Sequence, residues 1–313
     1  MGSATIGYVA AIVTIISWTI GTFAFTNASR LAPPASVNRV RLLYAWIVLS
    51  FLVCYMNQIS VTELFSRVNV LQYCWFGISG FIGLTLGDYF AFTAFKILGG
   101  RRASLFTCFA PGAALLTGML LIDEHLSATG ILGMLVSLAG IVMLAISRTE
   151  QSAVITDGHG NFYKGILFAA LGAICQGVGL VLAKKGFQTA GNSINPVHAS
   201  WIRMLSASFF VYVIGAFNVN LIHEFKSITF NKKTLKPILL GTLFGPVIGV
   251  SFSLLSATHI EASVAQTLFS LLPVSVLLAS VLFYKEKVLL RSYLAVLVSI
   301  IGVMILVWRN VFE

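Results

Sequence analysis

The stretch ASLFTCFAPGAALLTGMLLIDEHLS, residues 103–127, recurs in altered form 162 residues later as AQTLFSLLPVSVLLASVLFYKEKVL, residues 265–289. Each copy holds a proline inside an apolar segment and a glutamate after it. At the same offset, residues match without a gap from position 34 to the end, among them the pairs Pro34/Pro196, Arg41/Arg203, Gly83/Gly245, Gly87/Gly249, Phe90/Phe252, Pro111/Pro273, Glu124/Glu286, Ser137/Ser299 and Gly140/Gly302. Hydrophobic composition alone would not align Gly, Pro and ionisable residues, so the chain contains an internal duplication.

The composition places the chain in a membrane. Of its 313 residues 58% are hydrophobic and only 10% are charged, and the mean hydropathy is +0.94. Soluble domains carry about 25% charged residues, so this chain lacks the polar surface that water requires. The formal net charge of +10 would suggest a nucleic-acid partner in a soluble chain. Here the basic residues sit mostly at the ends of apolar segments, where they anchor helices, so we expect a lipid bilayer and no nucleic acid as the partner.

Ten apolar stretches approach the roughly 20 residues that a membrane-spanning helix needs. They lie at about 6–27, 36–55, 72–97, 102–121, 128–147, 164–183, 198–217, 236–257, 262–283 and 289–308. They lack the alternation of a lipid-facing barrel strand, and inside hydrocarbon every backbone amide must be satisfied internally. The sequence therefore predicts an all-α integral membrane protein with ten transmembrane helices.

The duplication divides these ten spans into two halves of five. We expect the first repeat at 1–150, a polar linker at 151–163 and the second repeat at 164–313. Because five is odd, the second half begins on the opposite side of the membrane, and the two five-helix repeats are inverted. Inverted repeats are common in secondary transporters, whose substrate sites lie near the midplane at the repeat interface.

The two quoted stretches, each followed by a Gly-containing apolar segment, resemble the EamA-type transporters of the drug/metabolite transporter superfamily. Arg41 and Arg203, early in the second span of each half, fit the same pattern. The chain departs from it at Asp123 and Lys285, where the family often has Gly before the glutamate. The resemblance implies ten helices in two inverted repeats and transport of small metabolites such as amino acids, nucleobases or drug-like cations, many by export.

Asp88 is the only acid within FIGLTLGDYFAFTAFKIL, residues 81–98. It lies about 15 Å from the end of its span by helix rise, and an ionisable residue at such a depth usually faces an interior or a water-filled cavity. Arg41, on the same membrane side, is the candidate counter-ion. Two interpretations stay open: a structural ion pair between helices, or a carboxylate that exchanges a proton or binds a cationic group of the solute.

Further candidates for a substrate site come from polar residues within spans. Pro111 and Pro273 interrupt equivalent spans in both halves, and discontinuous helices at matching places point to a binding site. The complete predicted set is Trp18, Arg41, Asp88, Thr107, Gln176, Arg203, Gln266 and Ser270. For Arg203 the alternatives are a side chain that reaches to the headgroups or one that meets an anionic solute group.

Small residues also recur every four positions in two equivalent spans, as Ser79, Gly83 and Gly87 and as Gly241, Gly245 and Gly249. Such stripes let helix backbones approach closely, which serves either static packing or sliding of the halves. Glu124 and Glu286 precede the next span, where a carboxylate favours a helix N-terminus.

The sequence thus predicts a secondary transporter that acts by alternating access. Its predicted solute is a small amino-acid-like or drug-like metabolite, and its predicted direction is export. We expect it in the bacterial inner (cell) membrane, without a cofactor or metal. A coupled proton or counter-solute and a homodimer stay open as partners. A membrane channel or an integral-membrane enzyme is the alternative, although we find neither a ring of pore-lining charges nor a catalytic motif. The orientation is also open, because the distribution of Lys and Arg favours external termini and the resemblance implies cytoplasmic ones.

Overall fold

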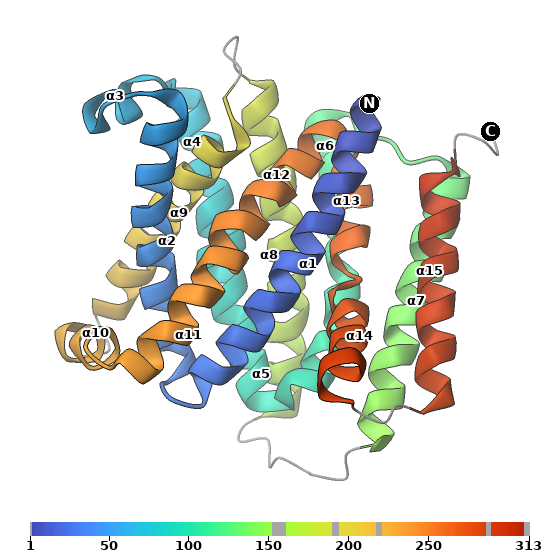
Figure 1. Ribbon diagram of the computed structural model, residues 1–313. Coiled ribbons are helices and arrows are strands. Elements are labelled where there is room, and N and C mark those ends of the chain that lie inside the picture. The colour runs from blue at the N-terminus through green and yellow to red at the C-terminus, as the bar shows by residue number, and fades with distance from the viewer. Residues whose placement is uncertain (1, 152–160, 190–193, 217–220, 286–288, 310–313) are drawn as a thin grey trace. The chain divides into compact units, whose positions relative to one another are not determined.

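The computed structural model describes residues 2–151, 161–189, 194–216, 221–285 and 289–309, and these residues form helices and connecting turns (Figure 1). Nine helices are long and apolar enough to cross a membrane among the residues described, and one further apolar helix is shorter. Most of the polar linker expected at 151–163 lies outside the described residues.

In chain order the elements are α1 (Ser3–Ser29), α2 (Pro34–Asn57), α3 (Val61–Ser66), α4 (Val70–Gly80), η1 (Phe81–Leu86), α5 (Gly87–Ser104), η2 (Leu105–Cys108), α6 (Phe109–Ile122), α7 (Ala128–Gln151), α8 (Phe162–Gln188), α9 (Pro196–Ala216), α10 (Leu221–Thr229), α11 (Lys232–Thr242), η3 (Leu243–Gly249), α12 (Val250–His259), α13 (Ala262–Phe269), α14 (Leu272–Tyr284) and α15 (Leu290–Val307). Here η1 and η3 are π-helical, and η2 is a 3₁₀ turn.

Nine of the ten predicted spans coincide with the long apolar helices. The fourth prediction, 102–121, was wrong at its start, because α5 continues to Ser104 and the apolar helix covers only Phe106–Ile122. A hydropathy window cannot separate the end of one helix from the start of the next when the residues between them are also apolar.

The internal duplication extends to irregular backbone. The π-helical segments η1 and η3 begin at Phe81 and Leu243, which are equivalent positions 162 residues apart. The helices α6 and α14 end with left-handed caps at Asp123 (φ 53°) and Lys285 (φ 52°), which are again equivalent. Glycine adopts this conformation at the lowest cost. The left-handed caps therefore explain why glycine suits these two positions.

The repeated prolines do not break the middle of a helix as the sequence suggested. Pro111 is the third residue of α6 and Pro273 the second residue of α14, and a proline in a first turn sacrifices no intrahelical hydrogen bond. The interruption comes just before, at the 3₁₀ turn η2 in the first half and at Ser270–Leu271 in the second. Both halves therefore contain a broken span whose second segment has a proline in its first turn.

The chain forms two compact units, and each draws on both halves of the sequence. Unit 1 consists of Met1–Asp88 and Leu182–His259, and unit 2 of Tyr89–Val181 and Ile260–Glu313. Each unit therefore combines helices that lie far apart in the sequence.

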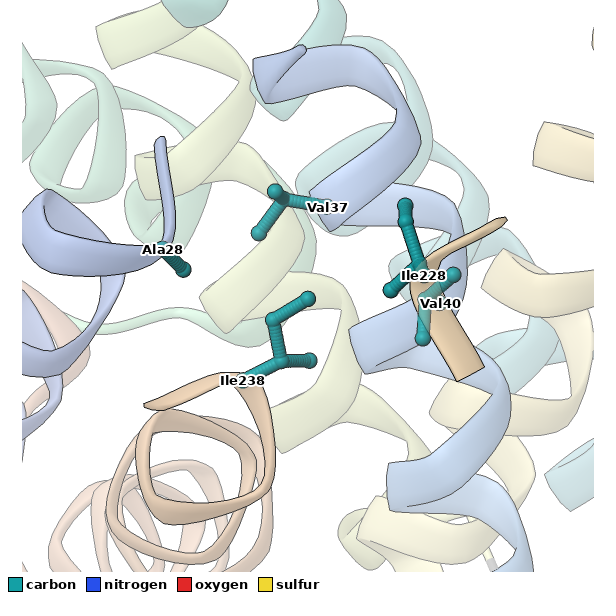
Figure 2. Close-up of a cluster of buried hydrophobic side chains, with 5 residues drawn as sticks. All are labelled: Ala28, Val37, Val40, Ile228 and Ile238. Carbon is teal, nitrogen blue, oxygen red and sulfur yellow. The ribbon is translucent and has the colours of Figure 1, made fainter. Parts of the chain in front are cut away.

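One end of unit 1 is held by an apolar cluster of α1, α2, α10 and α11 (Figure 2). Its buried members are Ala28, Val37, Val40, Ile228 and Ile238, with Phe25, Ala32, Tyr44 and Phe225 packed against them. Elsewhere in the unit, α1 packs along α11 and η3 through glycines. A Cβ at Gly21 would lie 3.3 Å from the backbone nitrogen of Gly245.

In unit 2, α7 and α15 lie side by side (Figure 1) and approach through small residues. A Cβ at Gly140 would lie 2.5 Å from the nitrogen of Ser299, and one at Gly302 would lie 2.1 Å from the nitrogen of Ser137. Each contact is the repeat equivalent of the other. As residue numbers rise along α7 they fall along α15, so these equivalent helices run antiparallel.

This packing predicts a position-specific cost for adding one methyl group. Gly302→Ala forces a side chain into the backbone of α7, so we expect the unfolding free energy in detergent micelles to fall by about 1–3 kcal/mol. Gly112→Ala is the matched control, because a Cβ there meets nothing within 4 Å and removes a flexible residue from a helix. Equal melting temperatures for the two variants would contradict the close approach of α7 and α15.

Candidate substrate site

Asp88 and Arg41 form an ion pair inside unit 1. Arg41 lies on α2 and Asp88 is the second residue of α5, and their side chains are only 15% and 13% exposed. Opposite charges attract more strongly in a medium of low dielectric constant, but each ion loses its hydration there. The pair predicted from sequence is therefore present, and it joins the second and third spans of the first half.

Two further contacts fix the guanidinium of Arg41. Its Nε donates a hydrogen bond to Oδ1 of buried Asn38 (2.6 Å), one turn earlier on α2. Its Cζ lies 5.2 Å from the ring centroid of Phe25 on α1, a cation–π distance. Three helical segments thus position Arg41.

Arg203 approaches the same carboxylate from the second half of the sequence. It lies on α9, is 5% exposed, and attracts Asp88 electrostatically. Its helix comes close because position 80 is a glycine, where a Cβ would lie 2.3 Å from the carbonyl oxygen of Arg203. Unit 1 therefore assembles Arg41, Asp88 and Arg203, three of the eight predicted site residues.

Trp18, a fourth predicted residue, is half-buried on α1 and packs against α11–α12. A Cβ at Gly249 would lie 2.3 Å from two atoms of its indole ring. Phe25 covers Gly241 and Gly245 in the same way. The glycine stripe of the second half thus serves as a packing surface for aromatic side chains of α1.

The other four predicted residues lie in unit 2. Thr107 sits in the 3₁₀ turn η2, Gln266 in α13, and Ser270 caps α13. The hydroxyl of Ser270 donates to the carbonyl oxygen of Gln266 (2.9 Å), which also accepts the backbone amide of Ser270. Ser270 therefore hydrogen-bonds to its own helix, α13, at the break before α14.

Gln176 is half-buried on α8, next to a close helix contact. A Cβ at Gly177 would lie 2.2 Å from the carbonyl oxygen of Ala110 on α6. The residue that follows Gln176 therefore packs against the first turn of α6, the helix that contains Pro111.

Sequence reasoning missed a second ion pair in unit 1. Arg39 on α2 pairs with Glu224 on α10, whose carboxylate also accepts the hydroxyl of Ser36 (2.8 Å). The amphipathic pattern of residues 221–229 was the available signal, but pairing across 185 positions has no local signature.

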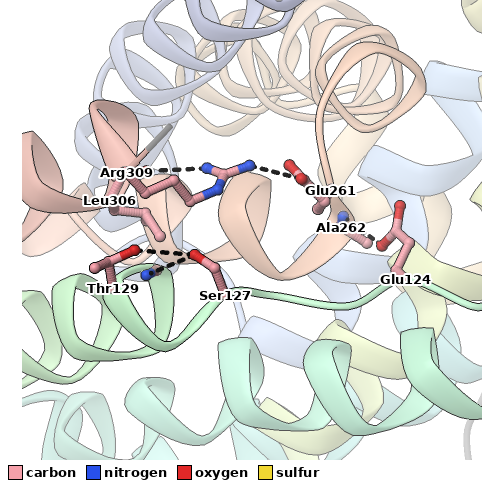
Figure 3. A network of polar contacts seen from close by, with 8 residues as sticks. Glu124, Ser127, Thr129, Glu261, Ala262, Leu306 and Arg309 are labelled. Carbon is pink, nitrogen blue, oxygen red and sulfur yellow. Dashed lines mark hydrogen bonds and ion pairs between the residues drawn. The ribbon is translucent and has the colours of Figure 1, made fainter. Parts of the chain in front are cut away.

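Polar contacts at one end of unit 2 tie the two halves together (Figure 3). Glu124 accepts the amide of Ala262, the first residue of α13 (2.8 Å). Arg309 donates to Glu261 (2.6 Å) and to the carbonyl oxygen of Leu306 (2.9 Å). Glu124 thus caps α13, a helix that lies far from it in the sequence. Ser127 accepts the amide of Gly130 near the start of α7 (3.2 Å).

The assembled side chains suit ion recognition better than covalent chemistry. Two guanidinium groups and one carboxylate leave a net positive charge, since arginine stays protonated in proteins. Among the residues described, no group of three or more His, Cys, Asp or Glu side chains is placed to hold a metal ion.

The long apolar helices identify an integral membrane protein. The model of the EamA-like transporter family matches residues 5–146 and again 163–308. The chain therefore belongs to the EamA-like transporter family and is a membrane transporter of the drug/metabolite type.

The fold has a counterpart of known structure. A crystal structure titled only "Crystal structure of protein" superposes with a TM-score of 0.73 at 17% identity, covering 96% of each chain. At this identity the likeness concerns the fold alone. No curated protein matches the chain.

The ion cluster predicts unequal costs for neutralising its members. Asp88→Asn removes the carboxylate that attracts both guanidinium groups, and we expect it to lower the unfolding free energy by about 3 kcal/mol. Arg41→Gln should cost less, because Arg203 still attracts the carboxylate. The double variant should lose less than the sum of the two, by about 1–3 kcal/mol.

Denaturation in detergent–lipid micelles measures these differences. Glu63→Gln is the control, because Glu63 lies on exposed α3 and glutamine can keep its capping box with Ser60. The ion cluster would be refuted as a stabilising contact by an Asp88→Asn variant that is as stable as Glu63→Gln.

Proposed function

We propose that the protein is a secondary transporter that moves a small amino-acid-like or drug-like metabolite by alternating access between two inverted five-helix repeats. Export across a bacterial inner membrane is the direction and location that the family resemblance favours. The observation that carries this proposal is the buried cluster of Arg41, Asp88 and Arg203 inside apolar spans, since ionisable groups at that depth mark substrate and ion pathways.

Contacts between equivalent helices support the inverted arrangement. In unit 2, α7 and α15 are antiparallel, as described above. In unit 1, Trp201 Nε1 donates to Ser50 Oγ (2.7 Å), and a Cβ at Gly215 would lie 3.4 Å from Cδ of Arg39. These two contacts run in opposite order along α2 and α9. Antiparallel packing of equivalent helices is what an axis in the membrane plane produces.

The paired irregularities support a moving transporter. Both halves have a π-helical segment, at η1 and η3, and a break before a proline, at η2 and at Ser270–Leu271. π-bulges frequently mark functional sites, and broken helices at matching places accompany binding sites in inverted-repeat transporters. We propose Thr107, Gln176, Gln266, Ser270 and Trp18 as further contacts of the solute.

Asp88 is also the proposed point of coupling. A proton or a counter-solute that weakens its attraction to Arg41 and Arg203 would change the charge of the cluster and so the occupancy of the site. Repeat symmetry does not require an acid here, because the equivalent position is Val250. We therefore assign the acid a role in the transport cycle.

Transport into proteoliposomes tests the function directly. The full chain, reconstituted and preloaded with unlabelled metabolite, should exchange a labelled metabolite with saturable kinetics and counterflow. We expect Asp88→Asn to reduce the rate at least tenfold and Glu63→Gln to leave it unchanged. If no solute of a broad metabolite panel moves in either direction, the proposal fails. A flux that does not saturate would favour a channel instead.

A further inference from the structure

We infer that the transported solute bears a carboxylate that pairs with Arg203. This inference rests on the proposed function and adds the chemical class of the substrate. It starts from a guanidinium that the protein buries without giving it a carboxylate of its own.

Arg203 differs from the other buried or half-buried arginines of the described residues. Arg39 pairs directly with Glu224, Arg41 with Asp88 and Arg309 with Glu261. Arg203 is as buried as these, at 5% exposure, yet its Nε has no hydrogen-bond partner in the described parts of the chain. A buried donor without a hydrogen-bond acceptor destabilises the folded protein by its full desolvation penalty, so a partner is expected.

Asp88 cannot supply that partner alone. Its carboxylate already pairs directly with Arg41 and reaches Arg203 only through longer-range attraction. The sequence of unit 1 contains two other acids, Glu63 and Glu224. Glu63 is fully exposed on α3, and Glu224 forms an ion pair with Arg39. The cluster of Arg41, Asp88 and Arg203 thus carries one uncompensated positive charge.

Reaching to the lipid headgroups does not account for this charge. An arginine that does so keeps its charged head exposed while its stem crosses apolar surface. Arg203 is instead covered, and its backbone is pinned where Gly80 permits close contact. Ser200, three residues earlier on α9, is fully buried and its hydroxyl likewise has no partner among the described residues. Side chains three apart are neighbours on a helix, so a second donor stands near the guanidinium.

The single excess positive charge of the cluster distinguishes between two anions that arginine can bind, a carboxylate and a phosphate. Guanidinium binds both carboxylate and phosphate through paired hydrogen bonds. A phosphate monoester carries between one and two negative charges at neutral pH and would leave the cluster negative. One carboxylate cancels the single excess charge and can accept from Arg203 Nε and the Ser200 hydroxyl. The charge balance therefore favours a carboxylate-bearing solute.

Ligand-induced stabilisation of the purified full chain in detergent tests this inference, because a ligand of the folded state raises its melting temperature. The probes are L-lactate, L-alanine, phenyllactate and L-phenylalanine, each beside its carboxamide, with sodium chloride as the inorganic anion. We expect one or more carboxylates to stabilise the protein, and their carboxamides and chloride to have little effect. Equal shifts from carboxylate and carboxamide, an equal shift from chloride, or no shift from any carboxylate overturns the inference.

Variants then assign the effect to Arg203. Arg203→Gln should weaken the effective carboxylate at least tenfold, and Arg203→Lys should weaken it less, because it keeps the charge and loses the paired geometry. Arg67→Gln removes one exposed positive charge from the same unit and should bind as the native chain does. If Arg203→Gln does not fold, Arg203→Lys decides, and unchanged affinity for the carboxylate in that variant overturns the inference.

Transport separates this inference from the function on which it rests. Asp88-dependent counterflow of a neutral or cationic solute that Arg203→Gln leaves intact would refute the carboxylate and leave the transporter standing. The absence of any transported solute would refute the transporter itself.

Discussion

The attraction between one carboxylate and two guanidinium groups inside apolar helices is the constraint on which the site depends. An isolated charge at such a depth is expensive, and a pair returns that cost only when its geometry is good. Asn38 and Phe25 hold Arg41 in place, and Gly80 brings α9 close enough for Arg203 to act on the same carboxylate. The helix packing of unit 1 is therefore also the means by which charge is concentrated there.

The backbone features of the two halves are symmetric, whereas the charged residues of the site are not. The duplicated features, namely the π-helical segments, the left-handed caps at Asp123 and Lys285 and the reciprocal contacts of Gly140 and Gly302, shape the backbone. The ion cluster is asymmetric, because Arg41 and Arg203 are equivalent whereas Asp88 has Val250 as its counterpart. The duplication thus accounts for the two arginines of the cluster but not for its acid.

Much of the fold could be predicted from sequence, because hydropathy and length are sufficient to locate helices in a membrane. The helix boundaries near Ser104 and the position of each break relative to Pro111 and Pro273 could not, since they depend on local hydrogen bonding within uniformly apolar stretches. The π-helical segments carry the same residues as an α-helix would. The Arg41–Asp88 pair was predictable from depth alone. The pairing of Arg39 with Glu224, and of Glu124 with the amide of Ala262, joins residues more than 130 positions apart and leaves no trace in local pattern.

The central proposal is that the two equivalent halves of the sequence cross the membrane in opposite directions. The most direct measurement uses Asp123 and Lys285, the equivalent exposed caps. Each is replaced singly by cysteine in a chain whose native cysteines are changed to serine or alanine. A membrane-impermeant thiol reagent is then applied to right-side-out and to inverted vesicles. Inverted repeats predict that one position is labelled only in right-side-out vesicles and the other only in inverted ones. Labelling of both positions from the same side would contradict the account.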